Sequence, residues 1–384
     1  MKVLYITNYD TMYGANKALY EMMCILKTDY DIEPYLLVPG AGGGVIGGKC
    51  SEKRIPILTY DFRISAIDEN TKWKPVRKFT RRVMRYFDFV RIWNDLKKNN
   101  AKFDIIHSNS SVFDIGYFLS RKMHVFHVWH IREFAKEGCG LELVLDKYSL
   151  QKKFQRSQAV ITISKAMEDV YRRNYSDIPI KHIYDGVELC EKYSKKYMYD
   201  DVLKFCIVGT VNKKKNVLDV LKACAKLCES DIDNFKLYIV GGVEEEYYEE
   251  LQDYIGMNEK IGNHVVFYGY CNNVDQILQT MDVGIIASES EGFGRVTVEY
   301  MANYMPVIGS DVASTNELLR GVGDLFAVHD IDALSNHMKK YIENTHLLKE
   351  IGMKSRGRAE FFSDKRNAHE IYSLYQEIMR KITR

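Results

Sequence analysis

Residues 281–311 read MDVGIIASESEGFGRVTVEYMANYMPVIGSD and contain one complete unit of a parallel sheet. The apolar run 281–287 predicts a strand, the turn 288–294 is polar, and 295–304 predicts a helix before a second apolar run begins at Pro306. A helix between two strands is typical of a parallel sheet, because the helix returns the chain to the same edge. This stretch therefore predicts an α/β fold.

The same alternation runs along the whole chain and restarts once. It begins with VLYIT at 3–7 and begins again with LKFCIVGTV at 203–211. Two doubly wound, Rossmann-like domains follow, which we place at residues 1–196 and 197–363, with the joint in a polar stretch from 189 to 201. The last segment, 364–384, has apolar residues at helical spacing and predicts a closing amphipathic helix.

Composition and charge restrict the class of protein. The 384 residues carry a net charge of +2, divided as +10 in residues 1–196 (33 Lys+Arg, 23 Asp+Glu) and −8 in the rest (21 and 29). No signal peptide or membrane-spanning run is visible, and the eight cysteines are scattered without metal-site spacing. We expect a cytoplasmic protein with reduced thiols. No nucleic-acid-binding module accompanies the basic half, so nucleic acid is not an expected partner.

A glycine-rich turn separates the first strand of the opening stretch from its helix. Gly292 and Gly294 lie where the N–H groups of a new helix have no partners within the helix, and these groups attract an anion. Glu291 lies in the turn and Glu299 inside the helix, so the two carboxylates should reach different parts of one ligand. A carboxylate accepts two hydrogen bonds from vicinal hydroxyls. The stretch therefore predicts a site for a phosphate or pyrophosphate with hydroxyl-bearing neighbours.

Simpler interpretations of the two carboxylates are also open. In one, Glu291 caps the helix and Glu299 is a surface residue, which is the ordinary meaning of an isolated pair at this spacing. In another, they form the acid/base pair of a glycosidase, which would require them to flank the scissile bond at about 5 to 9 Å.

The whole sequence from 291 to 311 is more specific evidence of function than the spacing of its two glutamates. Glu-Gly-Phe-Gly at 291–294, Glu299 and PVIGSD at 306–311 together resemble the nucleotide-sugar-binding core of the retaining glycosyltransferases of family 4, also called group 1. The resemblance implies the GT-B fold, with two Rossmann-like domains, an interdomain cleft and a C-terminal helix, 364–384, that crosses back to the first domain. It implies transfer of a hexose or N-acetylhexosamine from a nucleotide diphosphate sugar, UDP first, to a glycan or lipid-linked acceptor in bacterial surface polysaccharide synthesis.

Other stretches resemble the family across nearly the whole chain. VGTVNKKKN places Lys215 six residues after Gly209, where the family binds phosphate, and YGANK opens the first helix with Gly14. VWHIREF supplies His130 where the family has a histidine, although a lone histidine is more often structural. The rival histidines are His107, His124 and His127.

The resemblance assigns roles residue by residue. Glu299 would hold the ribose hydroxyls, Glu291 the hydroxyls of the transferred sugar, and Lys215 the diphosphate, while His130 would touch the sugar. His130, Glu291 and Lys215 are the residues expected to act in catalysis. The expected donor-binding residues are Gly14, Gly209, Thr210, Lys215, Tyr270, Glu291, Gly292, Phe293, Gly294, Arg295, Val296 and Glu299.

Thr210 departs from the family pattern, because an arginine commonly follows the glycine at Gly209. A threonine hydroxyl does not replace that bidentate charge, although Lys213 or Lys214 could compensate. The family transfers the sugar by front-face attack, with the leaving phosphate accepting the proton of the acceptor, and needs no metal or other cofactor. We accordingly interpret the two D-x-D sequences, 231–233 and 330–332, as solvated loop carboxylates.

The segment 72–98 joins ten Lys/Arg residues with six Trp, Phe and Tyr residues. Such a segment can form an amphipathic helix on an anionic membrane surface, which would make the protein peripheral at the inner face of the cell membrane. The alternative is a helix packed on the first sheet with a solvated basic face. The residues expected to contact acceptor or membrane are Asn109, Arg132, Trp73, Arg81, Arg82 and Arg85.

Two other functions on this fold are alternatives: a sugar-nucleotide epimerase and a non-catalytic glycosyltransferase-like partner subunit. A separate G-x-G-x-x-G sequence, beginning at Gly42, superficially matches a dinucleotide fingerprint. The next strand-like run follows after about ten residues, too few for the crossover helix of that fingerprint, so we expect a loop there.

Overall fold

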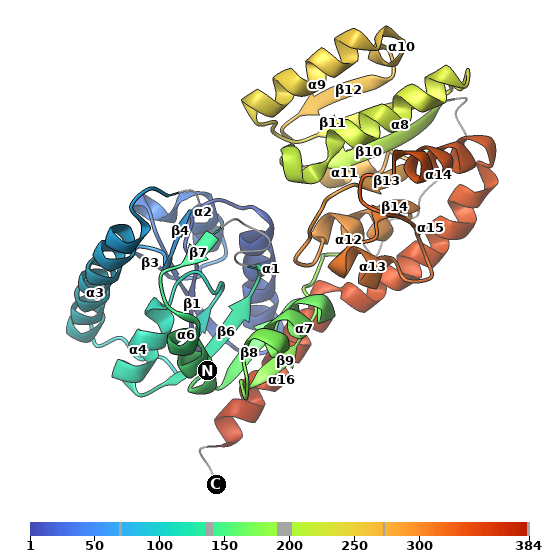
Figure 1. The fold of residues 1–384 in the computed structure, drawn as a ribbon. Helices are drawn as coiled ribbons and strands as arrows, with labels where there is room; N and C mark the ends of the chain where they lie inside the picture. The colour runs from blue at the N-terminus through green and yellow to red at the C-terminus, as the bar shows by residue number, and fades with distance from the viewer. Residues whose placement is uncertain (69–70, 135–140, 190–201, 272, 382–384) are drawn as a thin grey trace. The chain divides into compact units, whose positions relative to one another are not determined.

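The computed structural model describes residues 1–384 except 69–70, 135–140, 190–201, 272 and 382–384. The chain divides into two compact units, which are Met1–Glu188 with Asp364–Arg384, and Leu189–Ser363 (Figure 1). The joint expected at 189–201 lies outside the described residues except for Leu189. None of the helices in the described part of the chain is long and apolar enough to cross a membrane.

The first unit is built on a parallel sheet of seven strands in the order β3-β2-β1-β5-β6-β8-β9. Its internal strand β1 is KVLYI, and Val3 to Ile6 are fully buried because helices cover both faces of the sheet. The strands are β1 (Lys2–Ile6), β2 (Glu33–Val38), β3 (Ile57–Thr59), β5 (Ile105–Ser108), β6 (Phe126–Ile131), β8 (Ala159–Thr162) and β9 (Ile180–His182), with β4 (Ala66–Asp68) and β7 (Leu141–Leu143) forming a separate antiparallel pair.

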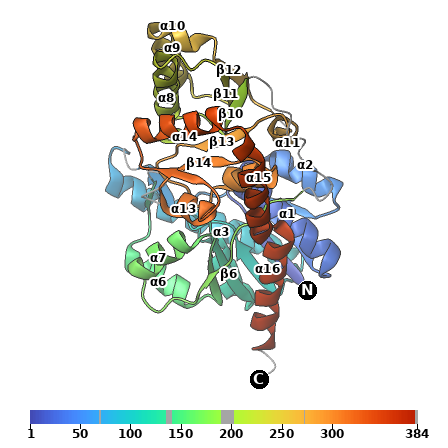
Figure 2. The same cartoon turned by 90° about the vertical axis from the view of Figure 1, so that its right-hand side faces the viewer.

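Seven α-helices of the described chain belong to this unit. They are α1 (Gly14–Asp29), α2 (Gly44–Glu52), α3 (Lys74–Lys98), α4 (Ile115–Met123), α6 (Lys147–Gln155), α7 (Lys165–Asn174) and the C-terminal α16 (Asp364–Arg380). α16 lies beside α1 (Figures 1 and 2), and its residues Ile371, Leu374, Tyr375 and Ile378 are buried in the same core as strand β1. The apolar spacing of the last segment therefore marks a face that the first unit covers.

The loop expected around Gly42 is wrong in part, because the chain forms a short helix there. A 3-10 turn, Ala41–Gly43, leads into α2, whose Ile46 and Cys50 are fully buried against the first sheet. Burial of this apolar side stabilises a helix that its glycines disfavour. The nine residues of α2 are enough to connect β2 to β3.

The second unit is a parallel six-stranded sheet in the order β12-β11-β10-β13-β14-β15. Its strands are β10 (Leu203–Val208), β11 (Phe235–Val240), β12 (Val265–Gly269), β13 (Val283–Ile286), β14 (Val307–Ser310) and β15 (Asp324–Phe326). Its helices are α8 (Val217–Glu229), α9 (Glu245–Met257), α10 (Glu259–Gly262), α11 (Val274–Leu278), α12 (Arg295–Ala302), α13 (Ala313–Leu319), α14 (Ile331–Glu343) and α15 (His346–Ala359).

Each sheet has one point where the strand order reverses. From β1 the chain moves to β2 on one side and later to β5 on the other, and β10 is likewise flanked by β11 and β13. In open parallel sheets, ligands bind at the carboxyl ends of the strands at this switch point. The loops after β10 and β13 are therefore the place to look for a ligand site in the second unit.

Candidate functional site

The opening stretch of the sequence folds as its pattern predicts. β13 ends at Ile286, the turn follows, and α12 begins at Arg295. Gly294 is the N-cap of α12, with φ +91°, a left-handed conformation that favours glycine over other residues. Glu291 lies in the turn and Glu299 one turn or more inside the helix, so the predicted arrangement of the two carboxylates is what the chain adopts.

Lys215 and Glu291 meet at the switch point of the second sheet. Nζ of Lys215 lies 2.5 Å from Oε1 of Glu291, and the two side chains are 30% and 17% exposed. Lys215 ends a 3-10 turn, Lys213–Lys215, that follows β10, whereas Glu291 follows β13. A lysine has three N–H donors, so this pair leaves Lys215 able to donate to an anion as well.

Three polar side chains that the sequence did not single out hold the glutamate turn. Ser314 donates to the carbonyl of Glu291 at 2.7 Å, Ser310 donates to that of Ser288 at 2.6 Å, and Asn216 donates to that of Ala287 at 3.1 Å. Because these bonds join the turn to β14, α13 and the start of α8, the turn is fixed before any ligand binds. Nothing in the local sequence distinguishes these residues from ordinary Ser and Asn.

The backbone after β10 also needs glycine. Gly241, at φ +140°, lies so close that an added Cβ would be 2.0 Å from the carbonyl oxygen of Gly209, which itself has φ +135°. Thr210 follows as an exposed residue. Lys213, one of the two lysines expected to compensate for the missing arginine, pairs instead with Glu250 at 3.2 Å on the surface.

Tyr300 fixes α12 to the sheet. Its hydroxyl accepts from the N–H of Val208 at 2.8 Å and donates to the carbonyl of Cys206 at 3.2 Å. Burial raises the pKa of this phenol well above its ordinary value, so the hydroxyl stays protonated. The ring packs directly over Gly284 of β13, where an added Cβ would lie 2.2 Å from it.

Other predicted donor residues differ in what their side chains can reach. Phe293 is buried and its ring packs on Phe362 at 5.8 Å between centroids, so only its main chain is available to a ligand. Tyr270 is exposed beyond the end of β12. Gly292, Arg295, Val296 and Glu299 are all partly buried.

In the first unit, His130 lies at the carboxyl end of β6 in a buried chain of hydrogen bonds. Its Nδ1 is 3.0 Å from Nε2 of His107, whose Nδ1 is 2.7 Å from the hydroxyl of Tyr375 on α16. Tyr375 in turn donates to the hydroxyl of Tyr5 at 3.2 Å. Burial, followed by the positive charge of Arg132, lowers the pKa of both histidines well below the ordinary value.

This chain of bonds sets the protonation of His130. Because the hydroxyl of Tyr375 donates to Tyr5, it accepts from Nδ1–H of His107, and Nε2 of His107 then accepts from Nδ1–H of His130. Nε2 of His130 is left as an acceptor, and it has no hydrogen-bond partner among the described residues. An acceptor at this position suits a hydroxyl group.

Asn109 and Arg132 form one buried cluster beside these histidines. Nε of Arg132 donates to Oδ1 of Asn109 at 2.6 Å, and the amide of Asn109 donates to the carbonyl of Ala15 at 3.2 Å. Nη1 of Arg132 lies 2.8 Å from the carboxylate of Asp185 but is not aligned with it as a hydrogen bond, so this contact is an ion pair. Gly14 is exposed, and an added Cβ there would touch nothing within 4 Å.

The predicted acceptor or membrane residues on α3 divide into two groups. Trp73 is 80% exposed as the N-cap of α3, and Arg82 is exposed too, whereas Arg81 is partly buried. Arg85 is only 9% exposed and pairs with Asp114 inside the unit, so its side chain does not lie on the exposed surface of α3.

The D-x-D carboxylates lie at or near the ends of helices α8 and α14. Asp330 caps α14 by accepting from the N–H of Ala333 at 2.9 Å, and Asp332 pairs with Lys226. Asp231 is an exposed residue in the left-handed conformation after α8. Helix capping and surface pairing account for Asp330 and Asp332.

Comparison with known proteins gives the family. The model of the glycosyl transferases group 1 matches residues 191–358, and that of glycosyltransferase family 4 matches residues 57–190. The putative glycosyltransferase EpsD of Bacillus subtilis is 29% identical over 172 residues, 44% of each chain. The UDP-Gal:alpha-D-GlcNAc-diphosphoundecaprenol alpha-1,3-galactosyltransferase of Escherichia coli is 24% identical over 274 residues, 66% of this chain and 70% of that protein.

The fold is also that of a solved structure. The structure of Anabaena HepE (Alr3699) in complex with UDP superposes with a TM-score of 0.78 at 17% identity, over 98% of this chain and all of that one. The alignments with several curated relatives cover about half of each relative, 44%, 51% and 55% of the length of three of them. The two matched models are adjacent and together reach from residue 57 to residue 358. With its two parallel-sheet units of the GT-B fold, the chain belongs to the family 4, or group 1, glycosyltransferases.

Proposed function

We propose that the protein is a retaining glycosyltransferase that moves a hexose or N-acetylhexosamine from a UDP-sugar to a glycan or lipid-linked acceptor in bacterial surface polysaccharide synthesis. The observation that carries the proposal is the pairing of Lys215 with Glu291 next to the N-terminus of α12, at the switch point of the second sheet. A lysine ammonium beside the positive end of a helix dipole suits a diphosphate.

The chemistry follows from where charge develops. Breaking the anomeric C–O bond leaves negative charge on the departing diphosphate, and donors placed there stabilise the transition state more than the bound substrate. Lys215, Arg295 and the helix N-terminus would supply this stabilisation without a metal. Glu291 would orient the sugar, Glu299 would bind the ribose hydroxyls, and Nε2 of His130 would accept from a sugar hydroxyl.

Relatives support the choice of donor and acceptor. Anabaena HepE was solved with UDP and with UDP-glucose, and the Escherichia coli relative is named for a UDP-galactose donor and a diphosphoundecaprenol-linked acceptor. A second relative, from Campylobacter jejuni, is also named for a diphospho-undecaprenol-linked acceptor. An acceptor that carries a lipid diphosphate fits the basic first half of this chain.

A ligand screen tests the proposal. Thermal stabilisation and donor hydrolysis are measured with UDP-, GDP- and ADP-sugars, with and without EDTA, for the wild type and for Glu299→Ala. We expect UDP-sugars to stabilise the protein, EDTA to have no effect, and Glu299→Ala to abolish the stabilisation. Binding of no nucleotide sugar would overturn the assignment, and binding without hydrolysis or transfer would favour a non-catalytic subunit.

A further inference from the structure

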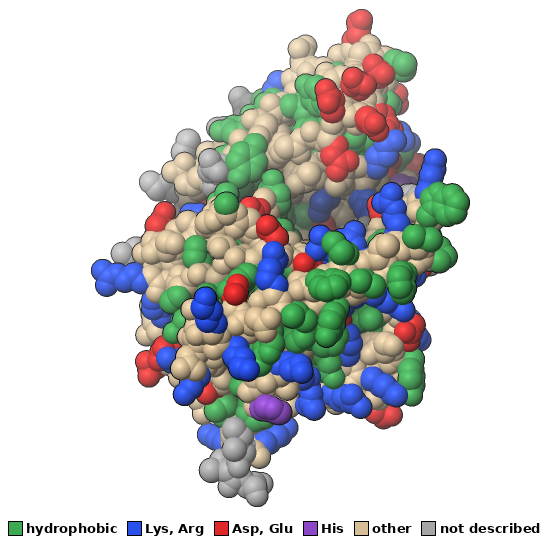
Figure 3. All heavy atoms as spheres, turned by 90° about the vertical axis from the view of Figure 1, so that its left-hand side faces the viewer, with side chains coloured by type: hydrophobic (Ala, Val, Ile, Leu, Met, Phe, Trp, Pro, Cys, Tyr) green, Lys and Arg blue, Asp and Glu red, His purple; other side chains and the backbone are tan. Residues whose placement is uncertain are grey.

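The N-terminal half of α3 exposes apolar side chains on one side. Val76, Phe79, Val83 and Phe87 follow one another at intervals of three or four residues, which places them along one side of the helix. Phe79 is 68% exposed and Phe87 is 62% exposed. Figure 3 views the side on which α3 lies in Figure 1 and shows apolar side chains gathered in a patch with Lys and Arg around it. We call the seven exposed residues the apolar face: Trp73, Val76, Phe79, Val83, Met84, Tyr86 and Phe87.

The opposite side of the same turns directs its charges toward the protein. Lys74 and Lys78 lie 3.1 Å and 2.5 Å from the carboxylate oxygens of Glu142, and Nη2 of Arg82 donates to the carbonyl of Val144 at 2.8 Å. A helix that merely covers a domain turns its apolar side inward. The first half of α3 is reversed in this respect, because its apolar side is exposed while Lys74, Lys78 and Arg82 contact the protein.

The second half of α3 has the usual orientation. Phe89, Ile92 and Leu96 are buried against the first sheet. This half anchors the helix, and the apolar face is therefore presented by an element that is already held in place. Exposed apolar patches of this kind mark surfaces that bind a partner or a membrane.

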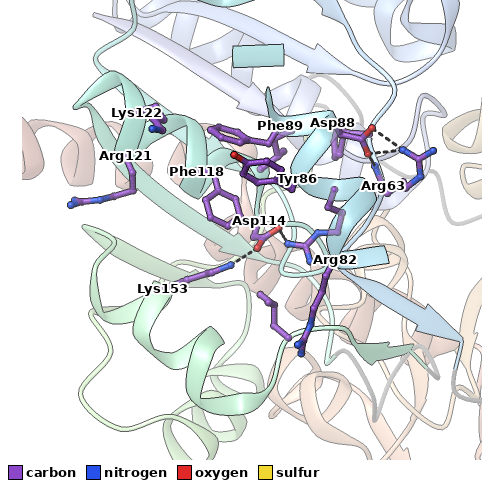
Figure 4. Close-up of a pocket in the computed structure, with 14 residues that line it drawn as sticks. Arg63, Arg82, Tyr86, Asp88, Phe89, Asp114, Phe118, Arg121, Lys122 and Lys153 are labelled. Carbon is purple, nitrogen blue, oxygen red and sulfur yellow. Dashed lines mark hydrogen bonds and ion pairs between the residues drawn. The ribbon is translucent and has the colours of Figure 1, made fainter. Parts of the chain in front are cut away.

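A pocket of about 400 Å³ lies beside the apolar face, and Tyr86 belongs to both. Four aromatic side chains line it, including Phe89 and Phe118, whose ring centroids lie 5.5 Å apart (Figure 4). Six cationic and two acidic side chains line it: Arg63, Arg82, Arg85, Arg121, Lys122, Lys153, Asp88 and Asp114.

Both acidic side chains in the pocket are already neutralised. Arg63 binds Asp88 at 2.8 Å, and Arg85 and Lys153 both bind Asp114. Burial alone would raise the pKa of Asp114, but these two cations hold it below the ordinary value. The pocket consequently keeps an excess of positive charge.

Part of that excess is available to a ligand. Arg121 and Lys122 at the end of α4 are exposed, and across the described part of the chain neither side chain has an ion pair or hydrogen bond. Cations beside apolar walls suit a phosphate attached to a hydrocarbon chain, because the cations attract the phosphate and the apolar walls contact the hydrocarbon.

We propose that the apolar face inserts into the surface of an anionic lipid bilayer and that the adjoining pocket binds the phosphate headgroup of a lipid in that bilayer. Charge complementarity selects this occupant. A symmetric contact between two copies would bring the cations around the face against one another, which is repulsive. A nucleic acid would match the cations but would leave Phe79 and Phe87 without an apolar partner.

Vesicle flotation of the full-length protein tests the proposal. Vesicles of phosphatidylcholine alone are compared with vesicles of equal parts phosphatidylcholine and phosphatidylglycerol, at low and high salt. We expect binding to the anionic vesicles only, weakened by salt because the cations are exposed. Trp73 should shift its fluorescence to shorter wavelength on binding.

Matched variants locate the contact. Phe79→Ser with Phe87→Ser should weaken binding to anionic vesicles at least about tenfold, because two inserted rings are lost. Met257→Ser with Met353→Ser removes two other exposed apolar side chains, which belong to the other unit, and should not change vesicle binding. Arg121→Glu with Lys122→Glu should weaken binding and reduce its salt dependence. UDP-sugar stabilisation, measured in parallel, should be unaffected in all three, which separates this proposal from the proposed function.

Two comparisons identify the headgroup and the possible failures. Phosphatidylcholine vesicles doped with a polyprenyl phosphate distinguish a lipid-linked acceptor from bulk phosphatidylglycerol, and inorganic phosphate at the same concentration tests whether a free ion competes. Recruitment of the protein by vesicles that carry either lipid supports the proposal and shows which lipid supplies the phosphate. Displacement of the protein from the vesicles by inorganic phosphate alone overturns it. Equal binding by wild type and Phe79→Ser/Phe87→Ser also overturns it, as does a change in self-association in place of vesicle binding.

Discussion

At the scale of the residue, the contact between Lys215 and Glu291 joins opposite charges that the proposed function assigns to different parts of one donor. Lys215 neutralises Glu291 and still has N–H donors for a diphosphate. Removing the lysine therefore has two consequences, because it deletes a donor and leaves a carboxylate unpaired beside an anion.

We expect Lys215→Ala to lower kcat about 10² to 10³-fold, the usual loss for a transition-state donor. Adding Glu291→Gln to Lys215→Ala should restore part of the UDP affinity, since the unpaired negative charge is removed. Calorimetric titration of UDP and steady-state kinetics measure the two effects. Lys213→Ala, which removes a surface lysine two residues away, is the control, and an equal loss there would contradict the assignment.

Three buried histidines in the first unit predict a dependence of its stability on pH. Burial lowers the pKa of His127 to about 3, and it lowers those of His107 and His130 well below the ordinary value. The unfolded chain binds protons near pH 6.5 and the folded chain does not, so stability is complete above pH 6.5 and falls as the pH decreases.

At about pH 5 each such histidine should cost about 2 kcal/mol of unfolding free energy relative to neutral pH. Urea unfolding at the two pH values measures the loss. His127→Gln should lower stability overall, but it should remove the contribution of one histidine from the loss of unfolding free energy at low pH. His369→Gln, on the surface of α16, should leave that loss unchanged. A pH dependence that survives His127→Gln in full would refute the role given to burial.

At the scale of the element, α12 is held by the close approach of Tyr300 to Gly284 of β13. Gly284→Ala would place a Cβ 2.2 Å from the ring, and the ring cannot move without breaking its bonds to Val208 and Cys206. We expect a loss of about 1 to 3 kcal/mol, the usual cost of overpacking, with weaker UDP binding because the helix N-terminus shifts.

Gly256→Ala in α9 is the matched control, since an added Cβ there meets nothing within 4 Å and alanine favours helix. Thermal unfolding of both variants with and without UDP measures the effect. If Gly284→Ala were as stable as Gly256→Ala, the ring contact would not be what positions α12.

The elements of the site differ in how far the sequence predicts them. The strand, turn and helix around Glu291 follow from apolar periodicity and two glycines, and the lysine position follows from the family resemblance. The hydroxyls of Ser310 and Ser314 and the ring of Tyr300 could not be predicted, because their partners are main-chain atoms up to about ninety residues away in sequence. The short α2 was missed because its stability comes from burial of Ile46 and Cys50 and not from helix propensity.

For the first half of α3, the sequence predicted the helix but not which of its sides is exposed. Its composition predicted an amphipathic helix, but the side that each type of residue faces depends on Glu142 and Asp114, which belong to other segments. The same pattern is compatible with a basic face in water or an apolar face in water. Contacts with other segments decide which side of the helix is exposed. Here Glu142 and Asp114 pair with basic residues of α3, and the apolar side is left exposed.

At the scale of the whole molecule, the first unit includes the last helix of the chain, α16, which follows the second unit in sequence. α16 adds Ile371, Leu374, Tyr375 and Ile378 to the core of that unit, and Tyr375 also ends the hydrogen-bonded chain to His107 and His130. Sequence predicted the helix by its spacing, and the family resemblance implied its partner. Its removal should therefore damage one unit selectively.

A chain that stops after Ser363 should lose the first unit and keep the second. Four buried side chains at about 1.5 to 3 kcal/mol each amount to about 6 to 12 kcal/mol, which is comparable to the whole stability of a domain. We expect the cooperative transition of the first unit to disappear in urea, while the second unit still unfolds cooperatively and is still stabilised by UDP, because Lys215, Glu291 and Glu299 all lie within Leu189–Ser363. A chain that stops after Lys381 is the control and should unfold like the wild type. Loss of UDP stabilisation in the shorter chain would mean that the donor site depends on the first unit, contrary to the placement of its residues.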